Sequence, residues 1–238
     1  MAFKIIVIGA SKGGLQALKT VLSALPAEFP LPVVVSQHRE KEADESLSQL
    51  LQKVSALTVV EAEDKQPILP GQIYLAPGNY HLLIEADSRQ SAVSSKQEKS
   101  PLPPASCLLP TSHCHFALST AEPVEYSRPS IDMLFESAAE VYGEGVIAVI
   151  LTGMNKDGAQ GLAAVKQAGG MAIVQDPRTA EASSMPKAAI AATVVDKILP
   201  LEEIGHFLAK IVGGGVKRGG RRQKNKRQEA VSRLTQGD

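Results

Sequence analysis

At 238 residues with 44% hydrophobic side chains, the chain is long enough to bury a substantial core, and we expect one large α/β domain. The formal net charge is zero, although residues 213–238 are strongly basic and the first 212 residues carry 23 acidic against 17 basic side chains. The chain has no apolar run as long as a membrane helix and no signal-peptide pattern at its start, so we expect a cytoplasmic protein with no membrane insertion.

The first elements expected are a strand, a glycine-rich turn and a helix. Residues 5–8 are apolar and mostly β-branched, and apolar residues recur with helical spacing between Leu15 and Leu25. The turn between them, Gly9-Ala10-Ser11-Lys12-Gly13, fits G-x-S-x-G, in which a serine is exposed and a helix amino terminus offers N–H groups to an oxyanion. Ser11 is therefore a candidate nucleophile.

Other glycine-rich turns have different functions. A phosphate-binding turn and a simple tight turn both remain compatible with these residues. A Walker P-loop is excluded, because Leu15 and Gln16 follow Gly14 where that motif has lysine and then serine or threonine. A dinucleotide site would lack its third glycine and its acidic residue, which leaves an NADP site using Arg39 as a minor alternative.

The second expected strand, residues 31–37, is apolar enough to be buried in a parallel sheet, and it ends at His38. Ser11 and His38 thus follow the carboxyl ends of consecutive strands, where open α/β sheets place their functional sites. The alternative is a histidine that only satisfies a loop.

The following segments predict a helix over about 44–54, capped by Asp44, and a short strand over 58–61. Residues 69–85 alternate turn signals with short β runs, which predicts a β-hairpin. His81 opens the second strand of that hairpin, and we expect it to have a structural role.

Residues 87–127 are rich in serine and proline and have no sustained period, which predicts a flexible insertion. Four residues in this segment, Cys107, His113, Cys114 and His115, have side chains that bind zinc, but their spacing lacks the pairs of a structural zinc site. We therefore expect no metal and no disulfide framework.

The second half of the chain alternates again between strands and helices. Strands are predicted at 146–151 and 171–175, and helices near 130–142, 159–168, 185–192 and 201–212. Strand 146–151 ends in a glycine-rich turn that contains Asp157, which is either a site residue or a simple helix N-cap. The full pattern predicts an open, doubly wound, largely parallel sheet with helices on both faces and a small β-hairpin.

The basic tail, residues 213–238, follows a glycine hinge and has too few apolar residues to fold alone. We expect a flexible, solvated extension. Attraction to nucleic acid or to an acidic protein partner is the alternative function.

Three strand ends therefore carry Ser11, His38 and Asp157, the residue types of a nucleophile, a general base and an orienting carboxylate. Their order along the chain, Ser, His, Asp, differs from the Ser, Asp, His order of α/β-hydrolases. A lipase-type assignment is therefore disfavoured.

A resemblance to a known family rests on six blocks that occur in one order: Ile8-Gly9-Ala10-Ser11 with Gly13-Gly14, Gln37-His38, Leu69-Pro70-Gly71-Gln72-Ile73-Tyr74-Leu75-Ala76-Pro77-Gly78, Arg128-Pro129-Ser130-Ile131-Asp132, Thr152-Gly153-Met154 with Asp157-Gly158-Ala159, and Gln175-Asp176 with Met185-Pro186. In these blocks the chain resembles the catalytic domain of the chemotaxis protein-glutamate methylesterases, the CheB family. The resemblance spans residues 5–190 and implies that residues 1–212 form the catalytic domain.

The resemblance implies Ser11 as nucleophile, His38 as base and Asp157 as the partner of His38, with Lys12 and Met154 lining the site or its oxyanion hole. It implies hydrolysis of γ-glutamyl methyl esters on the cytoplasmic helices of chemoreceptors or on a related modified protein. Many members of the family also deamidate receptor glutamines. No cofactor is implied.

The chain departs from the family pattern in three places. Lys12 stands where the family typically has threonine, and Arg39 stands where it often has an apolar residue, so both add positive charge near the expected site. The family usually carries an amino-terminal receiver domain, for which the ten residues before Ser11 leave no space. Residues 87–127 are also longer than the usual connection.

Two other functions remain as alternatives. A scaffold or regulator would keep the fold and dock through its basic tail, but the presence of all three triad residue types favours an enzyme. An NADP-dependent oxidoreductase of the short-chain type is disfavoured, because no tyrosine in the chain is followed four positions later by lysine.

Overall fold

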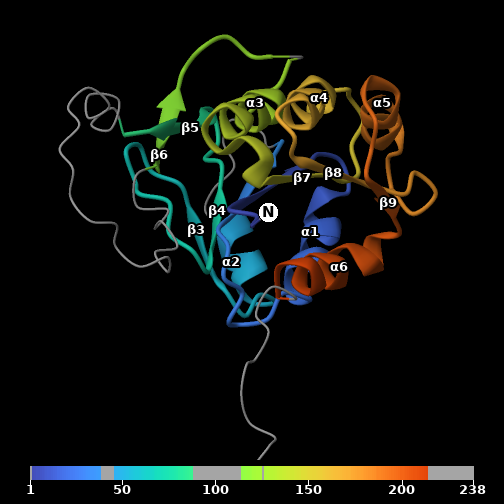
Figure 1. Cartoon of the computed structure of the whole chain (residues 1–238), viewed down its shortest axis with the longest axis horizontal. Coiled ribbons are helices and arrows are strands. Elements are labelled where there is room, and N and C mark those ends of the chain that lie inside the picture. The colour runs from blue at the N-terminus through green and yellow to red at the C-terminus, as the bar shows by residue number, and fades with distance from the viewer. Residues whose placement is uncertain (1, 39–45, 88–113, 125, 214–238) are drawn as a thin grey trace, which may run out of the picture.

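The computed structural model describes residues 2–38, 46–87, 114–124 and 126–213. Its main sheet has seven strands: β1 (Ile5–Ala10), β2 (Val33–Gln37), β3 (Thr58–Glu61), β4 (Gln72–Leu75), β7 (Val146–Ile150), β8 (Met171–Gln175) and β9 (Lys197–Leu199). Every pairing in this sheet is parallel, and the order is β3-β4-β2-β1-β7-β8-β9 (Figure 1). All residues of β1 and β7 are buried, which explains their continuously apolar sequences.

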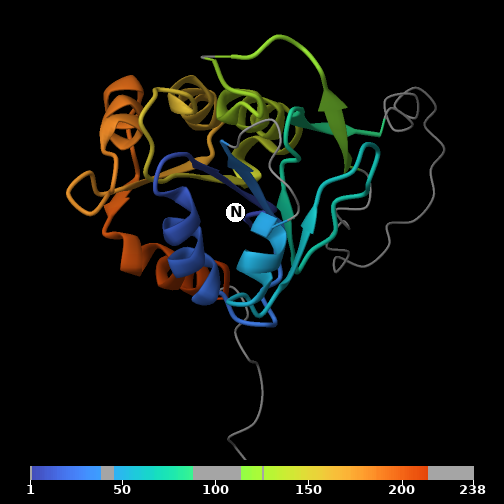
Figure 2. The same ribbon diagram turned by 180° about the vertical axis from the view of Figure 1, so that it is seen from behind.

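Helices cover both faces of the sheet. They are α1 (Gly14–Ser23), α2 (Ser46–Gln52), α3 (Ile131–Tyr142), α4 (Ala159–Gln167), α5 (Ser184–Ala192) and α6 (Leu201–Gly213), with a short 3-10 turn, η2 (Gly143–Gly145). Helices α3, α4 and α5 lie on one face, and α1, α2 and α6 lie on the other, as two opposite views show (Figures 1 and 2). This arrangement confirms the prediction of a doubly wound parallel sheet.

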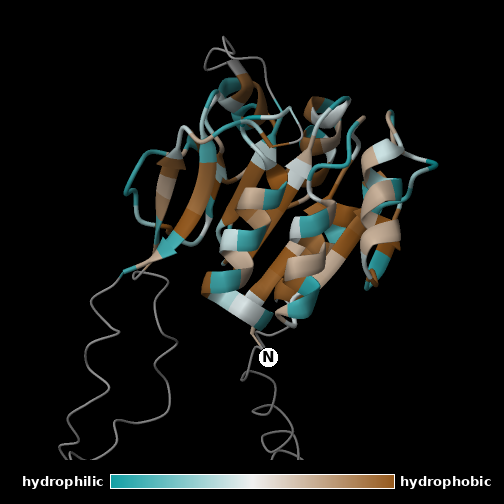
Figure 3. Cartoon of the chain, turned by 90° about the horizontal axis from the view of Figure 1, so that it is seen from above, coloured by the Kyte–Doolittle hydropathy of each residue, from teal (hydrophilic) through white to brown (hydrophobic). Residues whose placement is uncertain are grey.

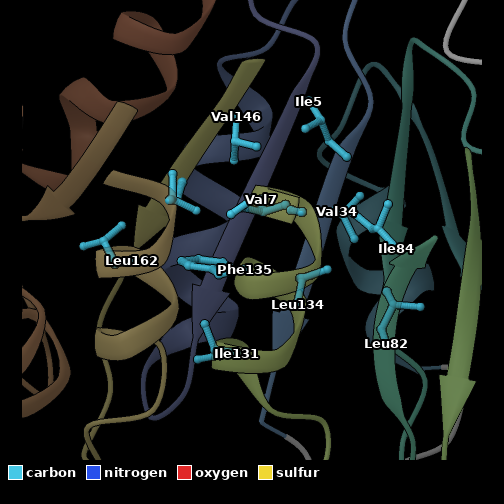
Figure 4. Close-up of a cluster of buried hydrophobic side chains, with 14 of the residues drawn as sticks. Ile5, Val7, Val34, Leu82, Ile84, Ile131, Leu134, Phe135, Val146 and Leu162 are labelled. Carbon is cyan, nitrogen blue, oxygen red and sulfur yellow. The ribbon is translucent and has the colours of Figure 1, made fainter. Parts of the chain in front are cut away.

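The core has two layers because strand residues alternate between the faces. In β1, Ile5 and Val7 belong to the layer under α3, α4 and α5, whereas Ile6 and Ile8 belong to the layer under α1, α2 and α6. Figure 4 shows side chains of the first layer, among them Phe135 of α3 and Leu162 of α4. Figure 3 shows that the sheet strands are among the most hydrophobic parts of the molecule.

The small antiparallel pair is present, but it is built from other strands than we expected. Its members are β5 (His81–Ala86) and β6 (Cys114–Ser119). The predicted hairpin within 69–85 is wrong, because β4 pairs in parallel with β2 and β3 in the main sheet. The turn residues between β4 and β5 show only that the first strand ends there. They do not show that the two strands pair with each other.

The prediction of a flexible insertion over 87–127 is also wrong for residues 114–119. These residues form β6, whose Phe116 is fully buried and packs with Leu82 and Ile84 of β5 in the layer that contains α3. Residues 88–113 lie outside the described residues. The strand was missed because its partner is distant in sequence.

Most other predicted elements are present with bounds within two residues of those expected, including β8 at residues 171–175. The three-residue strand β9 was not predicted. Arg39, Asp44 and the tail from 214 onward lie outside the described residues. Within the part that the structure describes, no helix has the length and apolar character needed to cross a membrane.

Candidate active site

The site lies where the strand order reverses. Strand β1 lies between β2 and β7, so the turns after these three strands meet at one edge of the sheet. Ser11, His38 and Asp157 lie on these three turns. This is the position at which open α/β sheets bind ligands.

The turn after β1 holds Ser11 rigidly. The Ser11 N–H donates to the carbonyl of Thr152 at 2.9 Å, and the Ser11 carbonyl accepts from the Gly14 N–H at 2.8 Å. Gly13 precedes α1 with φ 77°, a conformation that favours glycine. The side chain of Glu181 lies 2.7 Å from the place where a Cβ on Gly13 would be, so a larger residue would be both strained and crowded.

His38 connects the serine to the carboxylate. Its Nδ1 lies 3.1 Å from Ser11 Oγ, and its Nε2 lies 2.7 Å from Asp157 Oδ2. A carboxylate only accepts hydrogen bonds, so Nε2 carries the proton and Nδ1 is free to accept from the serine hydroxyl. The three side chains predicted from the sequence therefore form one hydrogen-bonded chain. The His38 side chain is only 13% exposed.

Asp157 is completely buried and bound by the amino terminus of α3. Its two oxygens accept from Ile131 N–H at 2.7 Å, Asp132 N–H at 3.0 Å and Ser130 Oγ at 2.9 Å, in addition to His38. A helix amino terminus stabilises an anion. Although burial alone would raise the pKa of Asp157, the hydrogen bonds from His38, Ile131 and Asp132 hold it below its usual value.

The simple N-cap alternative for Asp157 is wrong. The residue at the N-cap of α4 is Gly158, with φ 92°. The Asp157 carboxylate instead caps the earlier helix α3, where it accepts from the N–H groups of Ile131 and Asp132. Ser130 has two functions, since its hydroxyl donates to Asp157 and accepts from Met133 N–H at 3.4 Å. We predicted Ser130 only as the start of a helix. Ser130 is part of the Arg128-Pro129-Ser130 block of the family resemblance. That block was the signal available for the bond from Ser130 to Asp157.

A second buried carboxylate, Asp132, lies beside the first. It accepts from Gly161 N–H at 2.7 Å and so joins α3 to α4. Burial raises the pKa of Asp132 to about 6, and the nearby negative charges of Asp157 and Glu136 act in the same direction. The ionised form of Asp132 is therefore destabilised in the folded protein.

This carboxyl predicts a pH dependence of stability. The folded protein binds the Asp132 proton more tightly than the unfolded chain does. The contribution of the Asp132 carboxyl group to the free energy of unfolding therefore falls as pH rises from about 4 to about 6. Asp132→Asn keeps an acceptor for Gly161 and removes the titration. We expect the free energy of unfolding of the variant, relative to that of wild type, to increase by about 2 to 3 kcal/mol between pH 4 and pH 7. Denaturant unfolding at both pH values measures this, and a constant difference would contradict it.

Two polar side chains that we did not predict also approach His38. Ser127 Oγ and Asn155 Nδ2 each lie 3.4 Å from His38 Nδ1, and Asn155 Nδ2 donates to Ser127 Oγ at 3.2 Å. Both contacts are longer than the 3.1 Å between Ser11 and the same nitrogen. The imidazole edge that faces Ser11 is thus surrounded by hydroxyl and amide groups. His81 is buried and bonds to the Glu122 carbonyl and to the Ser130 N–H, which agrees with the structural role expected for it.

Lys12 and Met154 follow Ser11 and Gly153 at the rim of the site. Within the described part of the chain, the backbone N–H groups of Lys12 and Met154 donate to no protein acceptor. Both side chains are exposed, and that of Met154 is 62% exposed. An N–H group without a protein acceptor, such as that of Lys12 directly after Ser11, is available to bind an oxyanion.

In residues 2–38, 46–87, 114–124 and 126–213, no group of three or more His, Cys, Asp or Glu residues is placed to hold a metal ion. Cys114 and His115 lie on β6, and Cys107 and His113 lie outside the described residues.

In this parallel α/β fold, serine, histidine and aspartate lie together at the carboxyl ends of the strands. This arrangement is typical of serine-dependent hydrolases. Comparison with known proteins agrees. The sequence matches the CheB methylesterase family over residues 6–208, and the chain belongs to that family.

Two relatives show how far the sequence similarity extends along each chain. The chain is 44% identical over 211 residues to a putative protein-glutamate methylesterase/protein-glutamine glutaminase of Leptospira interrogans, covering 89% of this chain and 96% of the relative. It is 38% identical to the enzyme of that name from Nitrosomonas europaea, of which it spans only 53%.

A solved structure has the same fold. The crystal structure of the Thermotoga maritima CheB methylesterase catalytic domain matches with a TM-score of 0.76 and 36% identity. The match covers 89% of this chain and all of that domain.

Proposed function

We propose that this protein is a protein-glutamate methylesterase that hydrolyses γ-glutamyl methyl esters on chemoreceptor helices and also deamidates glutamine side chains. The observation that carries the proposal is the continuous hydrogen-bonded chain from Ser11 through His38 to the buried Asp157. Family membership supplies the substrate class. We propose that residues 1–212 form the catalytic domain, that 213–238 form a basic tail suited to an acidic partner, and that the protein acts in the cytoplasm.

In the first step, Ser11 Oγ attacks the γ-carbonyl carbon while His38 Nδ1 takes the hydroxyl proton. Asp157 keeps the other proton on Nε2 and stabilises the imidazolium that forms. The N–H groups of Lys12 and Met154 stabilise the oxyanion of the tetrahedral intermediate. His38 then gives its proton to the leaving group, so an ester releases methanol and an amide releases ammonia.

In the second step, water hydrolyses the γ-glutamyl ester of Ser11. His38 Nδ1 removes a proton from the water, a second tetrahedral intermediate forms at the same oxyanion donors, and the proton returns to Ser11 Oγ. The products are a free γ-carboxylate and regenerated enzyme. All these proton transfers use one imidazole edge, which is the edge that faces Ser11.

The direct test is release of methanol. Purified protein is mixed with receptor cytoplasmic fragments that carry methylated glutamates, and methanol is measured together with ammonia from unmodified glutamines. Release of neither product by the wild-type protein would contradict the proposed function.

The side chain of Lys12 predicts a salt effect. A positive charge at the rim should increase encounter with a carboxylate-rich receptor helix at low salt, and this attraction is screened beyond about 10 Å at 0.1 M ionic strength. We expect Lys12→Thr to retain turnover of a neutral small ester and to flatten the salt dependence of kcat/KM on receptor.

The control for this prediction is Lys53→Thr, which removes the same charge from the exposed turn after α2. It should leave the salt dependence at its wild-type slope. Equal slopes for wild type and Lys12→Thr would show that the Lys12 charge does not act on the substrate.

A further inference from the structure

Gln37 is the last residue of β2 and directly precedes His38, but the mechanism above does not use it. Its Nε2 donates to the carbonyl oxygen of Ser11 at 2.9 Å and to that of His38 at 3.1 Å. A carboxamide nitrogen has two hydrogens, so one group can make both bonds. The side chain therefore ties the main chain of the serine turn to the main chain of the histidine turn.

The first of these bonds also sets the direction of a neighbouring N–H. The peptide between Ser11 and Lys12 is trans, so the Lys12 N–H points opposite to the Ser11 carbonyl. That carbonyl is fixed from two sides, by Gln37 Nε2 and by the Gly14 N–H. Fixing the carbonyl fixes the direction of the Lys12 N–H, which is the proposed oxyanion donor.

We infer that Gln37 is a positioning residue for the reaction: its amide aims the Lys12 N–H at the oxyanion and maintains the 3.1 Å approach of Ser11 to His38, without contacting substrate. This inference rests on the proposed function, since it assumes that the serine is the nucleophile.

The surroundings of the amide leave it little freedom. A Cβ on Gly14 would overlap Gln37 Oε1 and would lie 2.8 Å from Gln37 Cδ and 2.9 Å from the Cβ of Ala10. Within the described residues, Oε1 is buried and accepts no hydrogen bond. The opposite amide orientation would place Oε1 against the carbonyls of Ser11 and His38, which repel it. The two carbonyls therefore determine which way the amide points.

The test replaces Gln37 by Met, which has a similar length and no N–H. We expect kcat for a small ester such as p-nitrophenyl acetate to fall about 100-fold with KM nearly unchanged, because a misdirected oxyanion donor affects the transition state more than substrate binding. Labelling of Ser11 by an alkyl fluorophosphonate should slow in parallel.

A second variant, Gln37→Glu, adds a readout that loss of packing would not give. An ionised carboxylate would repel both carbonyls, whereas the protonated acid has one O–H to donate. The ratio of variant to wild-type kcat/KM should therefore rise as pH is lowered, and a ratio independent of pH would contradict the inference.

The matched control is Gln52→Met, the same change in another structural glutamine. Gln52 donates to the Leu57 carbonyl at 3.2 Å and accepts from Val59 N–H at 2.9 Å, which connects α2 to β3. It should lose some thermal stability and keep wild-type kcat. A folded Gln37→Met protein with wild-type kcat would overturn the inference about Gln37 and would leave the proposed function unaffected. Wild-type protein that hydrolyses the small ester but not methylated receptor would overturn the proposed substrate and leave the effect of Gln37 measurable.

Discussion

Ser11→Ala is expected to reduce kcat for ester hydrolysis by about 10⁴-fold or more and to leave the fold intact. The hydroxyl forms the covalent bond to the acyl group in the proposed mechanism, and no other step replaces it. Ser11 is partly exposed on a turn fixed by main-chain bonds, so removing one oxygen disturbs little packing. Initial rates on a methylated receptor fragment and a small ester, with circular dichroism of the variant, measure both parts.

Ser127 provides a matched control, because its hydroxyl approaches the same nitrogen of His38 at 3.4 Å. Ser127→Ala should retain activity within about tenfold of wild type, since the longer contact leaves Ser11 as the better-placed nucleophile. A fluorophosphonate label should appear on Ser11 in wild type and be absent from Ser11→Ala. If Ser127→Ala lost activity and Ser11→Ala kept it, the assignment of the nucleophile would have to be reversed.

The sequence predicted the position of the site because the fold places strand ends together. Ser11, His38 and Asp157 each follow a strand that contains a run of buried apolar residues, and such strands are typical of a parallel sheet covered on both faces. Their carboxyl ends then share one edge. The residue types at these strand ends were those of a triad, and the family resemblance implied their roles. In the structure the three side chains lie within hydrogen-bond distance of one another through His38.

The supporting contacts could not be predicted in the same way. The carboxylate of Asp157 binds main-chain N–H groups of α3, and the amide of Gln37 binds main-chain carbonyls. Main-chain groups occur in every residue, so no pattern of residue types marks them. Strand β6 was missed for a related reason, since its pairing with β5 depends on tertiary contact across a long connection.

Asp157→Asn should reduce kcat by about 10³- to 10⁴-fold and also destabilise the protein. Four donors surround this carboxylate: His38 Nε2, Ile131 N–H, Asp132 N–H and the Ser130 hydroxyl. An amide has only one oxygen, so its NH₂ group must face two of them. On the Oδ2 side it faces His38, which can then bond to it only by moving the proton to Nδ1, and this blocks the base.

The neutral amide also removes the charge that stabilises the imidazolium, so activity falls in either orientation of the amide. The cost in stability should be about 2 to 4 kcal/mol at pH 7, since buried donors lose their acceptor. The low pKa of Asp157 means that the wild-type carboxylate stabilises the fold above about pH 4, and this advantage is lost as pH falls through the native pKa. The difference in unfolding free energy between wild type and variant should therefore narrow in acid.

Asp132→Asn is the control for this experiment, because it makes the same change in another buried carboxylate. Asp132 is the second residue of α3, the helix whose amino terminus binds Asp157. The Asp132 side chain bonds to Gly161 and not to His38, so the variant should keep kcat within a few-fold of wild type. At neutral pH the Asp132→Asn protein should be more stable than wild type, whereas Asp157→Asn should be less stable, because burial disfavours the ionised form of Asp132. Equal losses of kcat in the two variants would mean that general disturbance of the α3 amino terminus, and not the bond from Asp157 to His38, explains the effect.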